Sequence, residues 1–379
     1  MCSVYSALSG EVVLLLDDYE GKAAKEMKRF VASQIGVSRF RLRFLLEDTS
    51  KQIQDDEVFG SESVKIRLVV LEWWPTDIGE DTRMLAASRE NDSVTLEKLL
   101  ACPRDPNVLH TDGGTPLHHA ARAGHTEPMR LLLEAGAEKD ARDTEVQGYT
   151  PLLVAALNCQ ADSVALLIQA GADTDLATLD YGGTALHFAA LSGHVEVARL
   201  LIEGGADREL TTVSSGVIPA HFLFAGLALQ IALTIPNGAT PLILAAPMAN
   251  LEVVRLLVEA GADTNATADF GKTALHSAAQ SGHVEVARLL IENRMDIDKG
   301  TTCGETPLYL AAQNGHVDVV GLLLAARADC TARTHDGATP FLIATQCGHN
   351  EITRLLSVAA AVPAIEFEKC LASLAAQRQ

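Results

Sequence analysis

The chain has 379 residues, of which 48% are hydrophobic and only 4% aromatic, so it can fill packed cores but offers few aromatic rings for stacking. Its formal net charge of -19 repels polyanions, which argues against nucleic acid as a partner. Seven cysteines without a CxxC pair, and a start that lacks the basic and apolar segments of a signal peptide, predict an intracellular protein of the cytoplasm, the nucleus or both.

Several short elements are predicted in residues 1–73. They are strands at residues 3–7 and 11–16, a helix at residues 22–34, and strands at residues 40–46 and 64–71. With LSGEVVLLL, FRLRFLLED and KIRLVVL in this order, residues 1–73 resemble the ubiquitin-like (β-grasp) fold. The resemblance implies a small α+β domain that docks to ubiquitin-system components or covers the end of the next domain. Residues 74–81 are predicted to be a linker.

One pattern recurs through residues 82–357. Its first unit, at residues 82–101, is degenerate. A threonine opens each of seven clear units, at Thr115, Thr150, Thr184, Thr240, Thr273, Thr306 and Thr339. Glycine stands two residues before each of these threonines, and alanine stands five residues after it. Threonine caps the start of a helix, glycine permits the positive φ of a tight turn, and alanine lets neighbouring helices approach closely. Each unit is therefore predicted to hold a hairpin tip followed by a pair of helices.

The motifs of these units carry a family resemblance. Residues 115–121 are TPLHHAA and residues 273–279 are TALHSAA, and several units share this motif in phase. They resemble the ankyrin-repeat family, which implies a mainly α fold, a solenoid of helix-turn-helix and β-hairpin units. In such a solenoid each repeat buries its faces against its neighbours and leaves a concave side free for partner proteins.

An insertion and a tail depart from the repeat. The units are spaced by 33 to 35 residues except between Thr184 and Thr240, where the nearly uncharged residues 216–237 are inserted. The length of the insertion permits a membrane span, but its prolines and the matching repeats on both sides argue against one. The insertion also fits an apolar loop packed on the repeats, a partner-binding patch or a gene-model artefact. Residues 358–379 are predicted to form a capping helix or a tail, with the helix at residues 363–376.

The histidines and cysteines do not predict a catalytic or metal site. Eight of the 12 histidines recur at two fixed positions of the repeat, and the ankyrin resemblance implies hydrogen bonds within and between repeats for them. The remaining four, His110, His119, His221 and His335, show no ligand spacing with cysteine or aspartate. No nucleophile is paired with a base, and no glycine-rich phosphate loop is present. Neither enzyme activity nor a cofactor or metal is predicted.

The ankyrin resemblance implies that partner proteins bind at the hairpin tips and on the outward side of the first helices. The candidate residues at the tips are Asp112, Asp180, Tyr181, Asp269, Phe270, His335 and Asp336. The candidates on the first helices are His119, Arg122, Phe188, Leu191, Gln280 and Gln313. Because aromatic residues are scarce, Tyr181, Phe188 and Phe270 are the expected anchors, unless they pack against adjacent hairpins instead.

The predicted function is that of a non-enzymatic scaffold or adaptor that binds other proteins through its repeats. A different reading is a ubiquitin-system adaptor that brings cargo to the degradation machinery through residues 1–73. A third is a membrane-tethered repeat protein that is anchored through residues 216–237.

Two repeats lack the glycine that ends their second helix. Arg294 and Arg327 stand where other units have this glycine. Because an L-residue in the left-handed conformation costs about 1 kcal/mol, we expect both junctions to be looser, which hydrogen exchange tests.

Overall fold

The computed structural model describes residues 2–6, 12–16, 24–35, 39–46, 52–54, 65–70, 78–102, 104–144, 148–213, 216–217 and 234–361. Its internal contacts divide the chain into two compact units. The first unit comprises Met1–Ala155 and Asp162–Asp173, and the second comprises Ala156–Ala161 and Thr174–Gln379.

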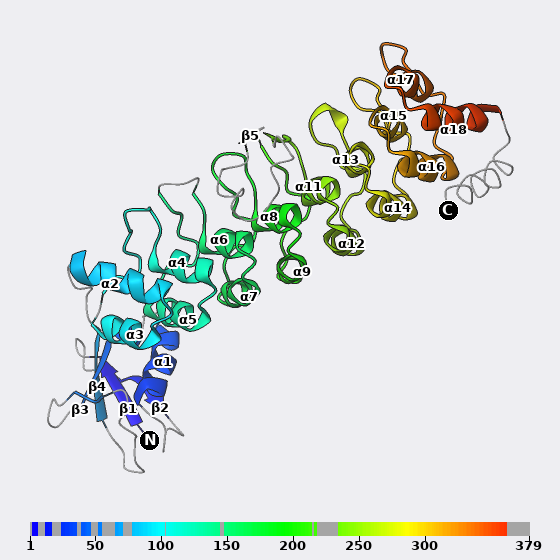
Figure 1. Ribbon diagram of the computed structural model, residues 1–379. Coiled ribbons are helices and arrows are strands. Elements are labelled where there is room, and N and C mark those ends of the chain that lie inside the picture. Colours follow the sequence, from blue (N-terminus) through cyan, green and yellow to red (C-terminus); the bar gives the residue numbers. More distant parts are fainter. Residues whose placement is uncertain are drawn as a thin grey trace, which may run out of the picture. The chain divides into compact units, whose positions relative to one another are not determined.

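The first unit begins with a mixed sheet and one helix (Figure 1). Its elements are β1 (Cys2–Ser6), β2 (Val12–Leu16), α1 (Ala24–Ile35), the 3-10 helix η1 (Arg39–Arg41), β3 (Leu42–Leu46) and β4 (Lys65–Val70). The strand order is β2-β1-β4-β3, and the central strands β1 and β4 are parallel while the outer pairs are antiparallel. Met27 and Val31 of α1 and Phe44 of β3 are fully buried. The strands and the helix expected in this part of the sequence are therefore present.

The first unit continues into paired helices. They are α2 (Ile78–Arg89), α3 (Ser93–Ala101), α4 (Pro116–Ala123) and α5 (Thr126–Ala135), followed by α6 (Pro151–Leu157) and α7 (Ala161–Gln169) at the boundary of the units. Helix α2 begins at Ile78, so the predicted linker at residues 74–81 was too long. The degenerate first repeat has no threonine-proline start, and the acidic Glu80 and Asp81 stabilise the first turn instead.

Ion pairs join the amino-terminal elements to α3 and α5 of the first unit. Arg39 Nε donates a hydrogen bond to Glu134 Oε2 at 2.6 Å, and Arg39 Nη2 lies 3.3 Å from Glu97 Oε1. Lys25 also pairs with Glu97, and Arg29 pairs with Glu134 at 2.7 Å. Because the Arg39 side chain is buried, its charge depends on these two carboxylates.

The second unit is a series of helix pairs. The first helices of the repeats are α8 (Ala185–Ser192), α11 (Pro241–Ala245), α13 (Ala274–Ser281), α15 (Pro307–Gln313) and α17 (Pro340–Gln346). The second helices are α9 (Val195–Glu203), α12 (Leu251–Glu259), α14 (Val284–Glu292), α16 (Val317–Ala325) and α18 (Asn350–Ala361). Each first helix contacts the next first helix, and each second helix contacts the next second helix, so they form two rows (Figure 1).

Shorter elements complete the second unit. The 3-10 helices η2 (Ala246–Met248) and η3 (Asp269–Gly271) lie between helices, and β5 (Gly216–Val217) pairs antiparallel with β6 (Thr234–Ile235). These two strands are the ends of the insertion, and residues 218–233 between them lie outside the described residues, as does the helix expected at residues 363–376. No helix in the described ranges is long and apolar enough to span a membrane.

At three first helices, a threonine and a histidine tie the helix start to the next repeat. In α13, Thr273 Oγ1 lies 2.8 Å from His276 Nδ1, and His276 Nε2 donates a hydrogen bond to the Glu305 carbonyl of the next repeat at 3.1 Å. His118 and His187 make the same two contacts. The histidines after the turn instead donate to a carbonyl of the preceding repeat, at His125, His194, His283, His316 and His349. The structural role expected for all eight repeated histidines is confirmed.

Candidate protein-binding surface

The hairpin tips of the repeats are held in register by backbone hydrogen bonds. In the second unit the carbonyl of each tip accepts a hydrogen bond from an amide of the next hairpin. These bonds run from Val213 N to Tyr181 O (3.0 Å), Asp269 N to Asn237 O (2.8 Å), Thr302 N to Phe270 O (2.7 Å) and His335 N to Cys303 O (2.9 Å). The Asp269 carboxylate adds a contact, because its Oδ2 accepts a hydrogen bond from the Asn237 amide at 3.0 Å. The tips therefore form a fixed edge.

Large apolar side chains project from this edge in the second unit. Leu179 is 72% exposed, Val213 is 67% exposed and Phe270 is 69% exposed. These three residues belong to hairpins of different repeats. The backbone hydrogen bonds between the hairpins limit how far they move relative to one another. Exposed apolar side chains on a preorganised edge favour contact with another protein.

Phe270 also has an unusual backbone conformation. It has a φ of 59° and a ψ of 18°, which is the left-handed region. A bulky residue there costs about 1 to 2 kcal/mol, and such strain clusters at functional sites. The Thr302 amide and the turn bond from the Gly271 amide to the Ala268 carbonyl hold this conformation.

Two of the three expected aromatic anchors are buried, which corrects the prediction. Tyr181 and Phe188 are each only 1% exposed, and their rings pack edge to face with centroids 6.1 Å apart. Gly183 makes this packing possible, because a Cβ at that position would lie 2.6 Å from the Tyr181 ring. The Tyr181 ring therefore folds back onto the first helix instead of pointing to solvent, and Leu191 on the same helix is buried as well.

The remaining expected site residues differ in exposure. Arg122, Asp180, Gln280, His335 and Asp336 are exposed, Asp112, Asp269 and Gln313 are half-buried, and His119 is buried. Leu179 and Val213 were missed by the sequence analysis. The signal that the sequence offers for them is a lone aliphatic side chain beside a predicted tip.

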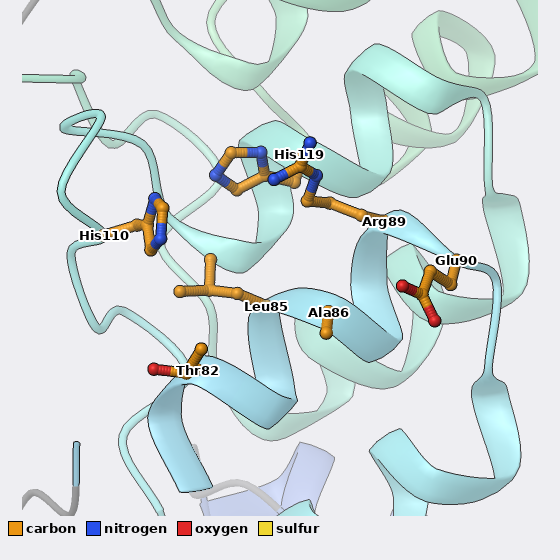
Figure 2. Close-up of a pocket in the computed structure, with 7 residues that line it drawn as sticks. All are labelled: Thr82, Leu85, Ala86, Arg89, Glu90, His110 and His119. Atoms are coloured by element: carbon orange, nitrogen blue, oxygen red, sulfur yellow. The ribbon is translucent and has the colours of Figure 1, made fainter. Parts of the chain in front are cut away.

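A group of three polar residues in the first unit was not predicted. His110, Asp112 and His119 each offer one ligand atom, and these atoms all lie within 4.8 Å of one another. Figure 2 shows His110 and His119 at a pocket of about 420 Å³, which Thr82, Leu85 and Arg89 of α2 also line. The hairpin before α4 carries His110 and Asp112, and α4 carries His119, so the fold brings together residues whose spacing matched no metal motif.

The comparisons with known proteins agree with the repeat architecture. A family model described as ankyrin repeats in three copies matches residues 84–178, 217–302 and 294–364, and the ankyrin-repeat model matches residues 181–213. These ranges cover more than half of the chain, which belongs to the ankyrin-repeat family. Ankyrin repeats indicate a protein-protein interaction scaffold. The matches begin at residue 84, so they do not show the resemblance of residues 1–73 to ubiquitin-like domains, which stays a prediction.

The similar curated proteins share only part of this chain. Ankyrin repeat and SOCS box protein 12 of Mus musculus is 36% identical over 77 residues, which are 19% of this chain and 25% of that protein. E3 ubiquitin-protein ligase XBAT33 of Arabidopsis thaliana is 41% identical over 63 residues, which are 16% of this chain and 12% of that protein. The chain therefore spans a quarter or less of the length of these relatives.

Proposed function

We propose that the protein is an adaptor that binds partner proteins through the hairpin tips of its second unit, with Phe270 as the central anchor. The observation that carries this proposal is the exposed Phe270 ring in a strained backbone conformation. Asparagine or glycine would adopt that conformation at little cost, so the presence of a bulky aromatic residue there supports a role of its side chain.

The charge and the neighbours of Phe270 describe the partner surface that fits. Leu179 and Val213 extend the apolar contact along the tips, and Asp180 is exposed beside Leu179. The chain as a whole carries a formal net charge of -19. We therefore infer a partner with an apolar strip and basic flanking residues, since complementary charge favours encounter.

The test replaces Phe270 with asparagine in the full chain. Phe270→Asn removes the ring but keeps a residue that tolerates the left-handed conformation, so the fold is expected to stay intact. The matched control is Cys303→Asn, because Cys303 is the corresponding tip residue of the next repeat and its carbonyl makes the same hydrogen bond. Both variants and the parent chain are used for affinity capture from a native lysate with quantitative mass spectrometry.

The expected result is selective loss of captured proteins with Phe270→Asn. Loss of an aromatic anchor that a partner buries on binding costs about 2 kcal/mol of binding free energy, which raises the Kd for a purified partner about 30-fold. The Cys303→Asn control keeps the captured set. Equal capture by both variants, with unchanged circular dichroism, would show that Phe270 is not an anchor.

We also propose, as a second candidate, that residues 1–73 link cargo on the repeats to ubiquitin-system components. The supporting observation is the mixed sheet with parallel central strands and one helix between the second and third strands. A relative whose name includes E3 ubiquitin-protein ligase gives further, limited support. The ion pairs of Arg39 with Glu97 and Glu134 also fit a simpler role, in which this segment covers α3 and α5, the second helices of the first two repeats.

The two roles of this segment are separated by comparing the full chain with a chain that begins at Ile78, the start of α2. Ubiquitin receptors or proteasome subunits that are captured only by the full chain support the adaptor role. An unchanged set of captured proteins, together with a lower resistance of α3 and α5 to proteolysis in the shorter chain, supports the covering role.

A further inference from the structure

We propose that His110, Asp112 and His119 bind a divalent transition-metal ion, with Zn²⁺ as the expected ion. The three residues lie on the hairpin before α4 and on α4 itself. His110 and His119 line the pocket of about 420 Å³ in the first unit (Figure 2). Imidazole and carboxylate groups are the ligands of three-residue zinc sites that keep one position open.

The distances between the ligand atoms fit such an ion. His110 Nδ1 lies 3.0 Å from Asp112 Oδ1, and His119 Nε2 lies 3.3 Å from the same oxygen. With zinc-ligand bonds of about 2.0 to 2.2 Å, the edge of a tetrahedron is about 3.3 Å. Two edges are therefore already near the length that the ion requires, and the ligand atoms of the two histidines lie within 4.8 Å of each other.

His119 differs from the structural histidines of the repeats. It is 5% exposed, and among the described residues its Nε2 has no hydrogen-bond partner of suitable geometry, whereas His118 Nε2 donates to the Tyr149 carbonyl at 2.9 Å. An unsatisfied buried polar atom costs about 1 to 3 kcal/mol. Burial also lowers the pKa of His119, so its ring is neutral and has a lone pair for a metal.

Asp112 is ionised and oriented by its neighbours. Burial opposes its ionisation, but without an ion the hydrogen bonds from His110 Nδ1 and from the Gly114 amide keep its pKa below the usual value. A bound ion would take the place of the proton on His110 Nδ1, since a metal ligand must be deprotonated. Gly114 also leaves room for the ion, because a Cβ at this position would lie 3.3 Å from His119 Nε2. The open pocket leaves the fourth coordination position to water or to a partner side chain.

Positive charge opposes the site and gives a second variant for the test. Arg89 lines the same pocket. Burial is the largest cause that lowers the pKa of His119; the Asp112 charge raises this pKa, and the charges of Arg122 and Arg89 lower it further. A guanidinium that disfavours a proton on His119 also disfavours a bound cation. Arg89→Gln is therefore expected to tighten metal binding, which no purely structural role of the histidines predicts.

The experiment titrates the untagged, chelator-treated full chain with Co²⁺ and follows the visible absorption, then displaces Co²⁺ with Zn²⁺. Asp112→Asn is the main variant, because it removes the charged ligand while it keeps an acceptor for the Gly114 amide. His119→Gln removes the buried ligand, and His335→Gln is the control, since His335 is an exposed histidine at another hairpin tip.

The expected result is one Co²⁺ per chain with an absorption spectrum of four nitrogen and oxygen ligands. Asp112→Asn weakens the Co²⁺ affinity at least about tenfold, because even the loss of a residue that only hydrogen-bonds a metal ligand costs about that much. His335→Gln leaves the affinity unchanged. Binding that is equal in Asp112→Asn and the parent chain overturns the proposal. So does a thiolate charge-transfer band, which would assign the ion to the cysteines, or the absence of binding to the parent chain.

Discussion

Two helices of identical sequence provide a measurement of backbone strain in this fold. Helix α9 and helix α14 both have the sequence VEVARLLIE. Two residues after α9 stands Gly205 with a φ of 90°, and two residues after α14 stands Arg294 with a φ of 60°. Arg294 and Arg327 both adopt the left-handed conformation, and the looser junctions expected from its cost stay a prediction. The variants Arg294→Gly and Gly205→Arg therefore change the backbone strain at one position each, after helices of the same sequence.

The expected change in the free energy of unfolding follows from two opposing contributions. An L-residue in the left-handed conformation costs about 1 to 2 kcal/mol, whereas glycine costs about 0.5 to 1 kcal/mol through its larger freedom in the unfolded chain. The difference predicts that Arg294→Gly raises the free energy of unfolding by about 0.5 to 1 kcal/mol. Gly205→Arg lowers it by a similar amount, because an added Cβ at Gly205 meets no atom within 4 Å.

The assay combines urea denaturation with hydrogen exchange of the amides in α9 and α14. Exchange is needed because repeat arrays unfold in parts, and a single transition does not report a local change. Arg294→Gly is expected to slow exchange in α14, and Gly205→Arg to speed it in α9. The variant with both changes matches the parent chain within about 0.5 kcal/mol, since the two sites are in separate repeats. A destabilised Arg294→Gly would refute the reasoning, because it would show that the arginine side chain makes a compensating interaction.

Three further outcomes are expected. Burial lowers the pKa of His276 to about 4. The unfolded chain thus binds more protons between pH 6.5 and about 4, and stability falls with decreasing pH by up to about 1.4 kcal/mol per unit. Denaturation at pH 7 and pH 5 checks this, and His276→Gln reduces the difference. Tyr181→Ala, which removes a buried ring, costs about 3 to 5 kcal/mol in urea denaturation, whereas an unchanged midpoint contradicts its burial. Thr306→Val removes the hydrogen bond from the Tyr309 amide to Thr306 Oγ1 and costs about 1 kcal/mol, measured in the same way.

The repeat architecture was predictable because its determinants are local and recur in every unit. Gly271, Thr273 and Ala278 lie within eight residues of one another and act on one hairpin tip and one helix. The same residue types return about every 33 residues, so a chance match is excluded. The left-handed conformation of Arg294 follows the same pattern, since Gly136, Gly171, Gly205 and Gly261 have it at the corresponding helix ends. Where these signals are absent, as at the start of α2, the boundary was misplaced by several residues.

The exposure of individual side chains was decided by tertiary packing. Tyr181 and Phe270 are both aromatic residues beside a tip glycine, but the Tyr181 ring folds back onto Phe188 while Phe270 remains exposed. Sequence position fixes where the Cα lies, whereas the direction of the ring depends on the space that Gly183 and the next hairpin leave.

The sequence by itself determined the family, the starts of the first helices in the seven clear units and the structural role of eight histidines, because each rests on a motif within one repeat or between neighbouring repeats. Only the tertiary structure decided that His119 is buried beside Asp112 and that Arg39 is buried between Glu97 and Glu134. These contacts join a loop to a helix, or a domain to its neighbour. Their distances depend on how elements pack in three dimensions, for which no single segment carries a signal.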